Sequence, residues 1–532
     1  MTVTPQDWIA HDPDPRTAAE LAACDPAELA ARFARPLAFG TAGLRGPVRG
    51  GPDAMNVAVV LRATWAVAQV LSQRGCGGGL AIVGRDARHG SAAFARMTAE
   101  VLAAEGFSVL LLPGPVPTPV VAFAVRHTGA AAGIQITASH NPATDNGYKV
   151  YLDDGIQIVS PTDHQIEAAM SSAPPADQII RKPVQPAGTD LIDRYIKRAA
   201  GVRRGTGSVR VALTPMHGVG GAVAVETLRR AGFDDVQTVA AQFAPDPDFP
   251  TVRFPNPEEP GATDALLALA AEVRADVAIA LDPDADRCAV GIPLGNSRAS
   301  GWRMLSGDET GWLLGDYILS RASNPESLVV ASTVVSSRML AAIAAHYGAV
   351  HVETRTGFKW LARADARAGG TLGYAYEEAI GHCVDPVAVR DKDGISAAVL
   401  VCDLVAMAKQ QGRSVSDVLD DLARRHGVHD VAAVSRRVAN PEEAAGWMQR
   451  LRAAPPDRLA GLAVTVTDIA DALIFTGGDG GTSIRVVARL SGTEPKVKCY
   501  LEVRCAGAGD LRHARERAAA VRAGLVSSVA GW

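Results

Sequence analysis

Three segments of the chain repeat one order of elements, and this internal repeat is the feature that most constrains the fold. Residues 80–139 predict a strand, a helix, a second strand and a third strand. The same order recurs over residues 209–287, with a long Pro-rich loop before the last strand, and over residues 327–381. Short β-branched runs that alternate with Ala/Leu-rich helices are typical of βαβ units on a parallel or mixed sheet. The repeat therefore predicts three α/β domains of similar topology.

The length of the chain supports this division. A chain of 532 residues is too long to bury its apolar residues in one core. The last hundred residues do not follow the repeat and predict a smaller α+β piece. We expect an α/β fold with three similar mixed-sheet domains and an α+β C-terminal domain around one central cleft. The expected boundaries are 1–204, 205–306, 307–432 and 433–532.

Charge and cysteine usage exclude several classes of function. The net charge is −4 with no basic block, which argues against nucleic acid as a partner. The N-terminus lacks an apolar signal region, and no uncharged apolar stretch is long enough to span a bilayer. The seven cysteines are scattered and form no CxxC pair. They predict buried free thiols in a reducing compartment, and we expect a cytoplasmic protein without a membrane partner.

Each repeat ends its third strand in a polar cluster. The clusters are TASHN (137–141), DPDADR (282–287) and YEEAIGH (376–382). In open α/β sheets, ligands bind beyond the carboxyl ends of the strands. Three clusters at matching places therefore predict a ligand site.

The DPDADR cluster predicts a metal site. Asp282, Asp284 and Asp286 alternate along a short segment, and three carboxylates so close together repel one another. A hard cation such as Mg²⁺ prefers oxygen ligands and removes that repulsion. The alternative is a solvated acidic turn. The apolar strand that leads into the cluster, and Arg287 directly after it, favour the metal.

The segment RLSGTEPK (489–496) predicts a phosphate site. Arg489 and Lys496 flank a Ser-Gly-Thr turn, so the segment offers two cations, two hydroxyls and backbone N–H groups. That set suits a phosphate group. The alternative is an ordinary hairpin turn with no ligand.

The TASHNP segment allows two interpretations. Ser139 at the end of a strand is either a nucleophile that carries phosphate or a residue that caps backbone groups in an ST-turn. His140 need not be its base, because neighbouring residues on a strand point to opposite faces. Lys149 is expected on the following hairpin strand, from which it reaches the same place. Glu377 and Glu378 are either a solvated pair or acceptors for sugar hydroxyls.

With these clusters in hand, the chain resembles the α-D-phosphohexomutase superfamily, which contains phosphoglucomutase and phosphomannomutase. The resemblance covers nearly the whole chain and follows the family order TASHNP, DPDADR, a Glu-containing loop, RLSGTEP. It is most similar to the subgroup with phosphopentomutase and glucose-1,6-bisphosphate synthase. The stretches that indicate this subgroup are FGTAGLRG, DNGYKVY, RTGFKW, YEEAIG and RDKDGISAAV.

The resemblance implies roles for individual residues. Ser139 resembles the serine that carries a phosphoryl group, and Lys149 a general acid or base, for which a lowered lysine pKa would help. Arg45, His140 and Arg287 resemble residues around the reacting phosphate. Implied Mg²⁺ ligands are Ser139, through its phosphate, and Asp282, Asp284 and Asp286. Implied substrate-binding residues are Lys359, Glu377, Glu378, Arg489, Ser491, Gly492, Thr493 and Lys496.

One position departs from the hexomutase pattern. Ile380 stands where many hexomutases have a serine that hydrogen-bonds a sugar hydroxyl. Either this apolar residue relaxes the selection of the sugar, so that pentose 1-phosphates are accepted, or it only packs against the strand.

The expected activity is that of a phosphosugar mutase. It moves a phosphoryl group between the 1-position and the 5- or 6-position of a sugar through phosphoserine and a bisphosphate intermediate, with a sugar bisphosphate as activator. The sequence leaves open synthesis of glucose 1,6-bisphosphate from an acyl phosphate, phosphopentomutase as the main activity, and a catalytically inactive sugar-phosphate binding protein. A monomer and a dimer are both compatible with the sequence.

Overall fold

The chain divides into two compact units. The computed structural model describes residues 4–40, 43–294, 301–490, 496–507 and 510–532. The first unit consists of Met1–Ser306, Gly357–Arg363 and Ala379–Met407, and the second of Gly307–Thr356, Ala364–Glu378 and Ala408–Trp532.

The N-terminal part of the first unit is built on a five-stranded mixed sheet. Its strand order is β1-β5-β4-β2-β3, with β2 parallel to both β3 and β4, and β5 antiparallel to β4 and β1. The strands are β1 (Leu44–Pro47), β2 (Leu80–Arg85), β3 (Ser108–Leu111), β4 (Ala132–Ile136) and β5 (Asp145–Leu152). The helices of this part are α4 (Val57–Gln73), α5 (Ser91–Ala104), α6 (Thr118–Thr128), α7 (Thr162–Ser171) and α8 (Asp190–Ala200), with a 3₁₀ turn η1 (Ala176–Gln178).

Local sequence sets where the first helices begin. The helices α1 (Pro5–Ala10), α2 (Pro15–Ala22) and α3 (Pro26–Ala34) each start with proline, directly after a Thr or Asp that caps the helix. Proline suits the first helical position because its fixed φ is helical and its missing N–H needs no partner there. Asn56 caps α4 by accepting a hydrogen bond from the Val59 N–H at 2.9 Å.

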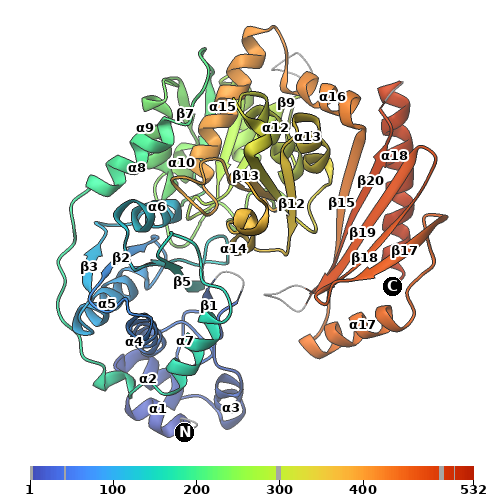
Figure 1. Ribbon diagram of the computed structural model, residues 1–532. Helices are drawn as coiled ribbons and strands as arrows, with labels where there is room; N and C mark the ends of the chain where they lie inside the picture. Colours follow the sequence, from blue (N-terminus) through green and yellow to red (C-terminus); the bar gives the residue numbers. More distant parts are fainter. Residues whose placement is uncertain (1–3, 41–42, 295–300, 491–495, 508–509) are drawn as a thin grey trace. The chain divides into compact units, whose positions relative to one another are not determined.

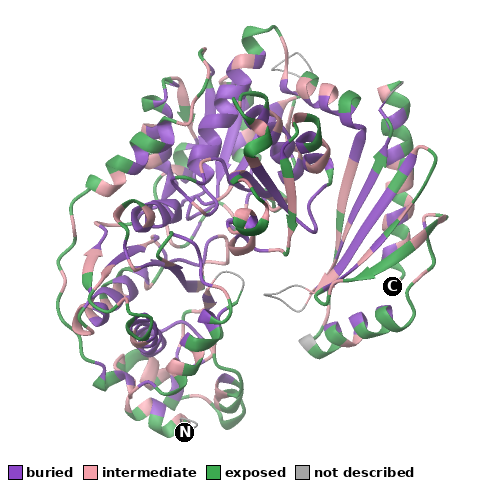
Figure 2. Cartoon of the chain, in the orientation of Figure 1, coloured by how far each residue is buried: buried purple, intermediate pink, exposed green. Residues whose placement is uncertain are grey.

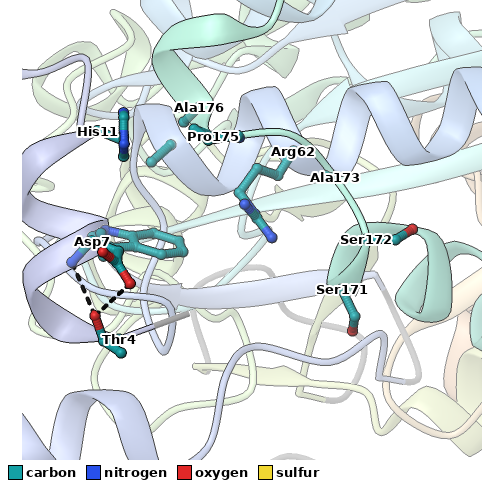
Figure 3. Close-up of a pocket in the computed structure, with 11 residues that line it drawn as sticks. Thr4, Asp7, His11, Arg62, Ser171, Ser172, Ala173, Pro175 and Ala176 are labelled. Atoms are coloured by element: carbon teal, nitrogen blue, oxygen red, sulfur yellow. Dashed lines mark hydrogen bonds between the residues drawn. The ribbon is translucent and has the colours of Figure 1, made fainter. Parts of the chain in front are cut away.

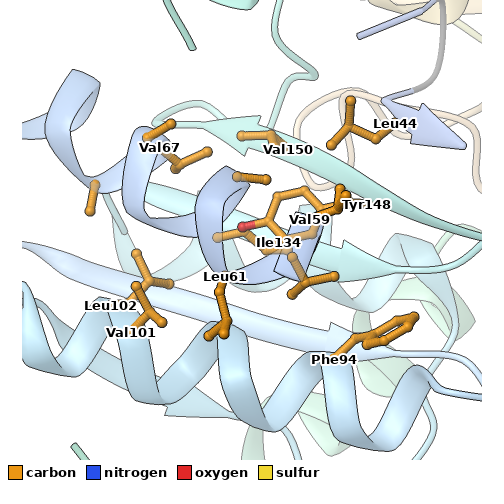
Figure 4. Packing of buried hydrophobic residues seen from close by; sticks show 14 of the residues in the cluster. Leu44, Val59, Leu61, Val67, Phe94, Val101, Leu102, Ile134, Tyr148 and Val150 are labelled. Carbon is orange, nitrogen blue, oxygen red and sulfur yellow. The ribbon is translucent and has the colours of Figure 1, made fainter. Parts of the chain in front are cut away.

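A hydrophobic core joins the buried helix α4 to α5 and the central strands. Figure 4 shows Val59 and Val67 of α4 on the side of Tyr148 and Val150 of β5, and Leu61 on the side of α5. Strands β2, β4 and β5 are largely buried, and so are the helices α4 and α6 (Figure 2). Burial of this apolar surface, at about 25 cal/mol per Å², is the main stabilising contribution to the fold.

A second five-stranded sheet in the first unit repeats the topology of the first. Its order is β10-β9-β8-β6-β7, with β6 parallel to β7 and β8, and antiparallel pairing elsewhere. The strands are β6 (Val211–Thr214), β7 (Val236–Thr238), β8 (Val277–Leu281), β9 (Cys288–Pro293) and β10 (Trp302–Met304). The helices are α9 (Gly220–Arg230), α10 (Ala240–Phe243) and α11 (Asp264–Glu272). The predicted repeat is therefore confirmed at the level of strand order.

Two segments from later in the sequence complete the first unit. The short segment 357–363 carries α14 (Phe358–Leu361). The segment 379–407 carries β14 (Gly381–Cys383) and most of α15 (Gly394–Gln410).

The second unit contains the third repeat. Its strand β11 (Leu328–Thr333) is parallel to β12 (Val350–Thr354) on one side and to β13 (Thr371–Glu377) on the other. The accompanying helices and turns are α12 (Gly307–Ser320), η2 (Pro325–Ser327), α13 (Met339–Tyr347), η3 (Ala364–Arg367) and α16 (Val415–His426).

The C-terminal part of the second unit is a six-stranded antiparallel sheet in the order β15-β20-β19-β18-β17-β16 (Figure 1). Its elements are β15 (Val428–Arg437), α17 (Pro441–Ala453), β16 (Arg458–Leu459), β17 (Leu462–Asp468), β18 (Ala472–Asp479), β19 (Thr482–Leu490), β20 (Lys496–Cys505) and α18 (Leu511–Ala530). Three α/β domains and a sheet-rich C-terminal domain confirm the predicted fold class.

The described helices were also considered as membrane spans. None of them combines the length and the hydropathy that crossing a bilayer requires.

Candidate active site

Ser139 lies in the loop that follows β4. The strand ends at Ile136, three residues earlier than the sequence predicts. Ser139 itself has a φ of 53°, in the left-handed region that residues other than glycine rarely adopt. Its side chain is 1% exposed, and its Oγ donates a hydrogen bond to Asp282 Oδ2 at 2.7 Å.

The same backbone conformation recurs at the corresponding place in each repeat. Ala285 after β8 and Ile380 after β13 both have a φ of 54°. In each case the chain turns sharply just beyond the third strand. The repeat therefore extends from the order of the strands to the geometry of the functional loops.

The three aspartates after β8 form the compact cluster that the sequence predicts. The carboxylate oxygens of Asp282, Asp284 and Asp286 lie within 4.8 Å of one another, and all three residues are at most 1% exposed. The Oδ1 atoms of Asp284 and Asp286 are buried and accept no hydrogen bond from the described part of the chain. Oxygen ligands in this arrangement are compatible with binding a hard divalent cation.

The other oxygens of the cluster are held by neighbouring side chains. Lys149 Nζ donates to Asp284 Oδ2 at 2.7 Å and to Asp286 Oδ2 at 2.9 Å. Thr118, the first residue of α6, donates from Oγ1 to Asp284 Oδ2 at 2.5 Å. The Lys392 ammonium lies 3.3 Å from Asp286 Oδ2. These contacts fix the orientation of the carboxylates and leave the two Oδ1 atoms available. In metal sites, residues that hydrogen-bond the metal ligands orient them in the same way.

Burial and charge shift the pKa values of this cluster in opposite directions. Burial, together with the charges of Asp284 and Asp286, raises the pKa of Asp282 well above its usual range. Burial would also raise the pKa of Asp284, but the Lys149 ammonium outweighs it and lowers that pKa. Burial would lower the pKa of Lys149, but the two carboxylates raise it. The surroundings therefore do not lower the pKa of Lys149, because the structure places the ammonium against two anions.

Three further predicted residues surround the Ser139 loop. His140 Nδ1 lies 3.3 Å from Ser139 Oγ, and burial together with Arg287 and Arg45 lowers the His140 pKa well below its usual value. The Arg287 N–H donates to Asp282 Oδ1 at 3.0 Å, and its guanidinium lies 3.8 Å from Asp286 Oδ1. Arg45 donates from Nη1 to Asn141 Oδ1 at 3.2 Å. The structure thus brings His140, Arg287 and Arg45 together with Ser139.

Arg88, which was not predicted from the sequence, holds the Ser139 loop in place. Its guanidinium, whose side chain is 1% exposed, donates to four backbone carbonyls of the loop. The Nη2 atom is 2.6 Å from the oxygens of Ser139 and Asn141, and Nη1 is 2.6 Å from that of Pro142 and 3.1 Å from that of Asp145. Arg88 lies beyond the end of β2, so only the tertiary fold places it beneath Ser139. Lys392 and Thr118 were missed for the same reason.

Three of the predicted substrate-binding residues lie outside the Ser139 loop and the aspartate cluster. Lys359, in the first unit, donates to the Gly40 carbonyl at 3.4 Å, and burial lowers its pKa. In the second unit, Glu378 Oε2 accepts hydrogen bonds from Thr333 Oγ1 and Ser336 Oγ, each at 3.0 Å. Glu377 is the last residue of β13.

The predicted phosphate segment joins two strands of the C-terminal sheet. Arg489 lies near the end of β19, opposite Lys498 of β20, and Lys496 begins β20. Ser491, Gly492 and Thr493 lie outside the described residues.

Ile380 is buried, with 2% of its surface exposed. It packs in a hydrophobic cluster with Ala212, Met216 and Ala289 around the second sheet. Its carbonyl accepts a hydrogen bond from the Cys288 N–H at 3.0 Å. This position favours the packing alternative over contact with a sugar.

Comparison with known proteins gives the family. Three models described as phosphoglucomutase/phosphomannomutase α/β/α domains I, II and III match residues 36–176, 193–295 and 306–426. A Haemophilus influenzae protein named "Probable phosphomannomutase" is 40% identical over 80% of this chain and 88% of its own length. The human phosphopentomutase is 33% identical over 91% of this chain and 87% of its own length.

A solved structure gives the same fold. A Burkholderia thailandensis protein of the phosphoglucomutase/phosphomannomutase family superposes with a TM-score of 0.69, at 21% identity, over 92% of this chain and 98% of that one. The fold and the matched domains define a phosphosugar mutase. The chain belongs to the phosphoglucomutase/phosphomannomutase family.

Proposed function

We propose that Ser139 carries the phosphoryl group of this mutase. In this proposal, phosphoserine 139 donates its phosphoryl group to one end of a sugar monophosphate, and the other phosphate of the resulting bisphosphate returns to Ser139. The observation that supports this role is the 2.7 Å contact of Ser139 Oγ with Asp282, inside a cluster in which two carboxylate oxygens have no hydrogen bond from the described residues. A sugar bisphosphate would act as activator by restoring the phosphoserine.

We propose Mg²⁺ as the cation of the cluster. Asp282, Asp284 and Asp286 would hold it together with an oxygen of phosphorylated Ser139. Three buried carboxylates and two available Oδ1 atoms fit an oxygen-preferring cation of this size and charge. When bound, the cation supplies positive charge that stabilises the phosphoryl group in transit.

The chain's own groups account for the proton of the transfer. The bond between phosphorus and Ser139 Oγ breaks as a bond between phosphorus and the sugar oxygen forms. His140, which burial keeps neutral, lies 3.3 Å from Ser139 Oγ and would relay the proton. Its free ring nitrogen would take the proton of the sugar hydroxyl, and the imidazole would give its other proton to Ser139 Oγ. Lys149 stays an ammonium and balances negative charge during transfer.

We propose that further residues bind the substrate. Arg489, Lys496 and the segment between them would bind the phosphate that does not react. Glu377 and Glu378 would accept hydrogen bonds from sugar hydroxyls, and Lys359 would bind near the sugar. Ser491, Gly492 and Thr493 belong to the phosphate segment by resemblance.

The substrate class follows from the family. We propose that the enzyme interconverts sugar 1-phosphates with 5- or 6-phosphates and that it accepts both pentoses and hexoses. Support comes from relatives whose names refer to mannose and pentose phosphates at 40% and 33% identity. Synthesis of glucose 1,6-bisphosphate from an acyl phosphate would use the same residues.

A substrate panel tests this proposal. Turnover of glucose 1-phosphate, mannose 1-phosphate, ribose 1-phosphate and deoxyribose 1-phosphate is compared by kcat/KM, with Mg²⁺ and a trace of glucose 1,6-bisphosphate. Bisphosphate formation with and without 1,3-bisphosphoglycerate separates the synthase from the mutase. A preference of one hundredfold or more for a single sugar would contradict broad specificity.

Mass spectrometry tests the role of Ser139. Incubation with glucose 1,6-bisphosphate is expected to add one phosphoryl group to the wild-type chain and none to Ser139→Ala. The matched control Ser72→Ala changes an exposed serine near the end of α4 and should be phosphorylated like the wild type. A phosphoryl group on Ser139→Ala with retained turnover would overturn the assignment.

A further inference from the structure

A pocket of about 790 Å³ lies in the first unit, between α1, α4 and the connection from α7 to η1 (Figure 3). Its lining contains none of the residues assigned to the active site. The volume is within the range of sites for small organic ligands. The chemistry of the floor and of the rim indicates the kind of ligand that this pocket binds.

A buried cation forms part of the floor. Arg62 comes from the middle of α4 and is 9% exposed. Its guanidinium donates to the carbonyls of Pro174 at 3.1 Å and Met170 at 2.9 Å. Among the described residues, no carboxylate forms an ion pair with it, and burial lowers its pKa. A buried charge without a counter-ion is costly, and the terminal nitrogens, which carry two N–H groups each, have donors to spare.

An aromatic ring lies beside Arg62. Trp8 is 7% exposed, and the Arg62 Cζ atom is 5.7 Å from the centre of its ring. The indole Nε1 is buried, so a ligand in the pocket does not reach it. The floor therefore presents one cation beside an aromatic surface.

The walls and the rim restrict the ligand further. Ala58, Ala173 and Ala176 are buried and give the pocket an apolar wall. At the exposed rim, the Asp7 carboxylate accepts a hydrogen bond from Thr4 Oγ1 at 2.7 Å (Figure 3). A carboxylate at the entrance repels a dianion more than a monoanion. The pocket is suited to a ligand that carries one negative charge on a compact apolar body.

We propose that this pocket binds a small organic carboxylate, with the carboxylate on the Arg62 guanidinium and the apolar body against the alanine wall. The site is separate from the proposed mutase centre. It gives the chain a second small-molecule site.

Fluorine NMR of the full-length protein tests the proposal with 4-fluorobenzoate as the probe. Saturable binding is expected, and the neutral 4-fluorobenzamide should bind at least tenfold more weakly. Arg62→Gln removes the charge and should weaken 4-fluorobenzoate by about ten- to a hundredfold, as expected for a charge-assisted hydrogen bond. Arg62→Lys keeps the charge and should weaken 4-fluorobenzoate less than Arg62→Gln does.

Two controls locate the probe. Arg74→Gln changes an exposed arginine at the end of the same helix and should bind like the wild type. Arg489→Ala should also bind 4-fluorobenzoate normally, and a loss there would place the probe at the mutase centre and overturn the proposal. Because Arg62→Gln also removes contacts to two carbonyls, the comparison of 4-fluorobenzoate with 4-fluorobenzamide on the wild-type chain decides the case if the variant is unstable. Equal binding of the two probes would refute the proposal. Tighter binding of 4-fluorophenyl phosphate than of 4-fluorobenzoate would refute the carboxylate class.

Discussion

Replacing Arg88 by lysine should lower the turnover rate of the mutase without weakening the binding of its substrate. The guanidinium binds four carbonyls of the loop that carries Ser139, at 2.6 to 3.1 Å. It holds Ser139 in a left-handed conformation that is otherwise unfavourable by about 1–2 kcal/mol. In that conformation Ser139 Oγ points at Asp282. Arg88 is thus a positioning residue, acting on the reaction through the backbone of the loop.

The size of the effect follows from the count of donors. A lysine ammonium has three N–H groups on one atom, and it cannot reproduce the planar fork that serves four carbonyls. At least one carbonyl then loses its donor, and a buried unsatisfied group costs about 1–3 kcal/mol. If about 2–3 kcal/mol is lost from the productive loop conformation, kcat falls roughly 30- to 150-fold. The KM for sugar phosphates should change little, because the Arg88 side chain is 1% exposed.

The assay separates positioning from folding. We would measure kcat, KM, the single-turnover rate of Ser139 phosphorylation from excess glucose 1,6-bisphosphate, and the melting temperature. Both kcat and the phosphorylation rate should fall together. Arg85→Lys is the matched control, since Arg85 is the last residue of β2, three residues before Arg88, and donates to the Asp86 carbonyl. A kcat within threefold of the wild type in Arg88→Lys would refute the reasoning.

Four other outcomes are expected. Asp284→Asn should lower turnover more than a hundredfold at saturating Mg²⁺ with unchanged circular dichroism, and near-normal turnover would contradict a metal role. Arg489→Ala should raise KM more than it lowers kcat, because the phosphate it binds does not react; a fall in kcat alone would exclude that role. Ile380→Ser should lower the free energy of unfolding by about 2–4 kcal/mol and leave the order of kcat/KM among sugars unchanged, whereas a new hexose preference would mean that this position contacts the sugar. Burial raises the pKa of Asp308 to about 8, above its unfolded value of 3.8. Between these two pH values the folded chain holds a proton that the unfolded chain releases. The free energy of unfolding should therefore fall by roughly 1.4 kcal/mol per pH unit as the pH rises through this range. Asp308→Asn should remove that slope in urea unfolding at pH 5.5 and 7.5, and an equal slope in both proteins would show that Asp308 is not its source.

Sequence reasoning found the features that local pattern determines. The third strands of the repeats predicted where Ser139 and the aspartates lie, because ligands of open α/β sheets bind beyond the carboxyl ends of the strands. The placement of Lys149 on the next hairpin strand is also confirmed, opposite Gln135 of β4. These inferences needed only the period of the strands and the order of the elements.

Two helices were not predicted, and proline-rich sequence accompanies both. Helix α6 begins at Thr118 within the run PGPVPTP, and α11 lies in the stretch interpreted as a Pro-rich loop. Proline in the interior of a helix breaks it, but proline in the first turn is tolerated. Helix α6 has its proline in the first turn. The pattern alone did not distinguish the two cases.

Side-chain environments could not be predicted from local sequence. The raised pKa of Lys149 depends on two carboxylates that lie more than a hundred residues away in the chain. The burial of Ile380 depends on apolar residues of the second sheet. Both effects arise from contacts between separate repeats, and the sequence pattern within one repeat does not predict such contacts.

The composition of the first unit has a consequence for biosynthesis. Residues Ala379–Met407 belong to this unit although the third repeat is made before them. Ile380 covers an apolar cluster of the second sheet, and Lys392 contacts Asp286. A ribosome at roughly 5–20 residues per second needs about 5 to 20 s to pass from Ser306 to Met407. During that interval the nascent chain exposes an unfinished apolar surface, so the first two repeats depend on the translation of the third before they are protected from aggregation.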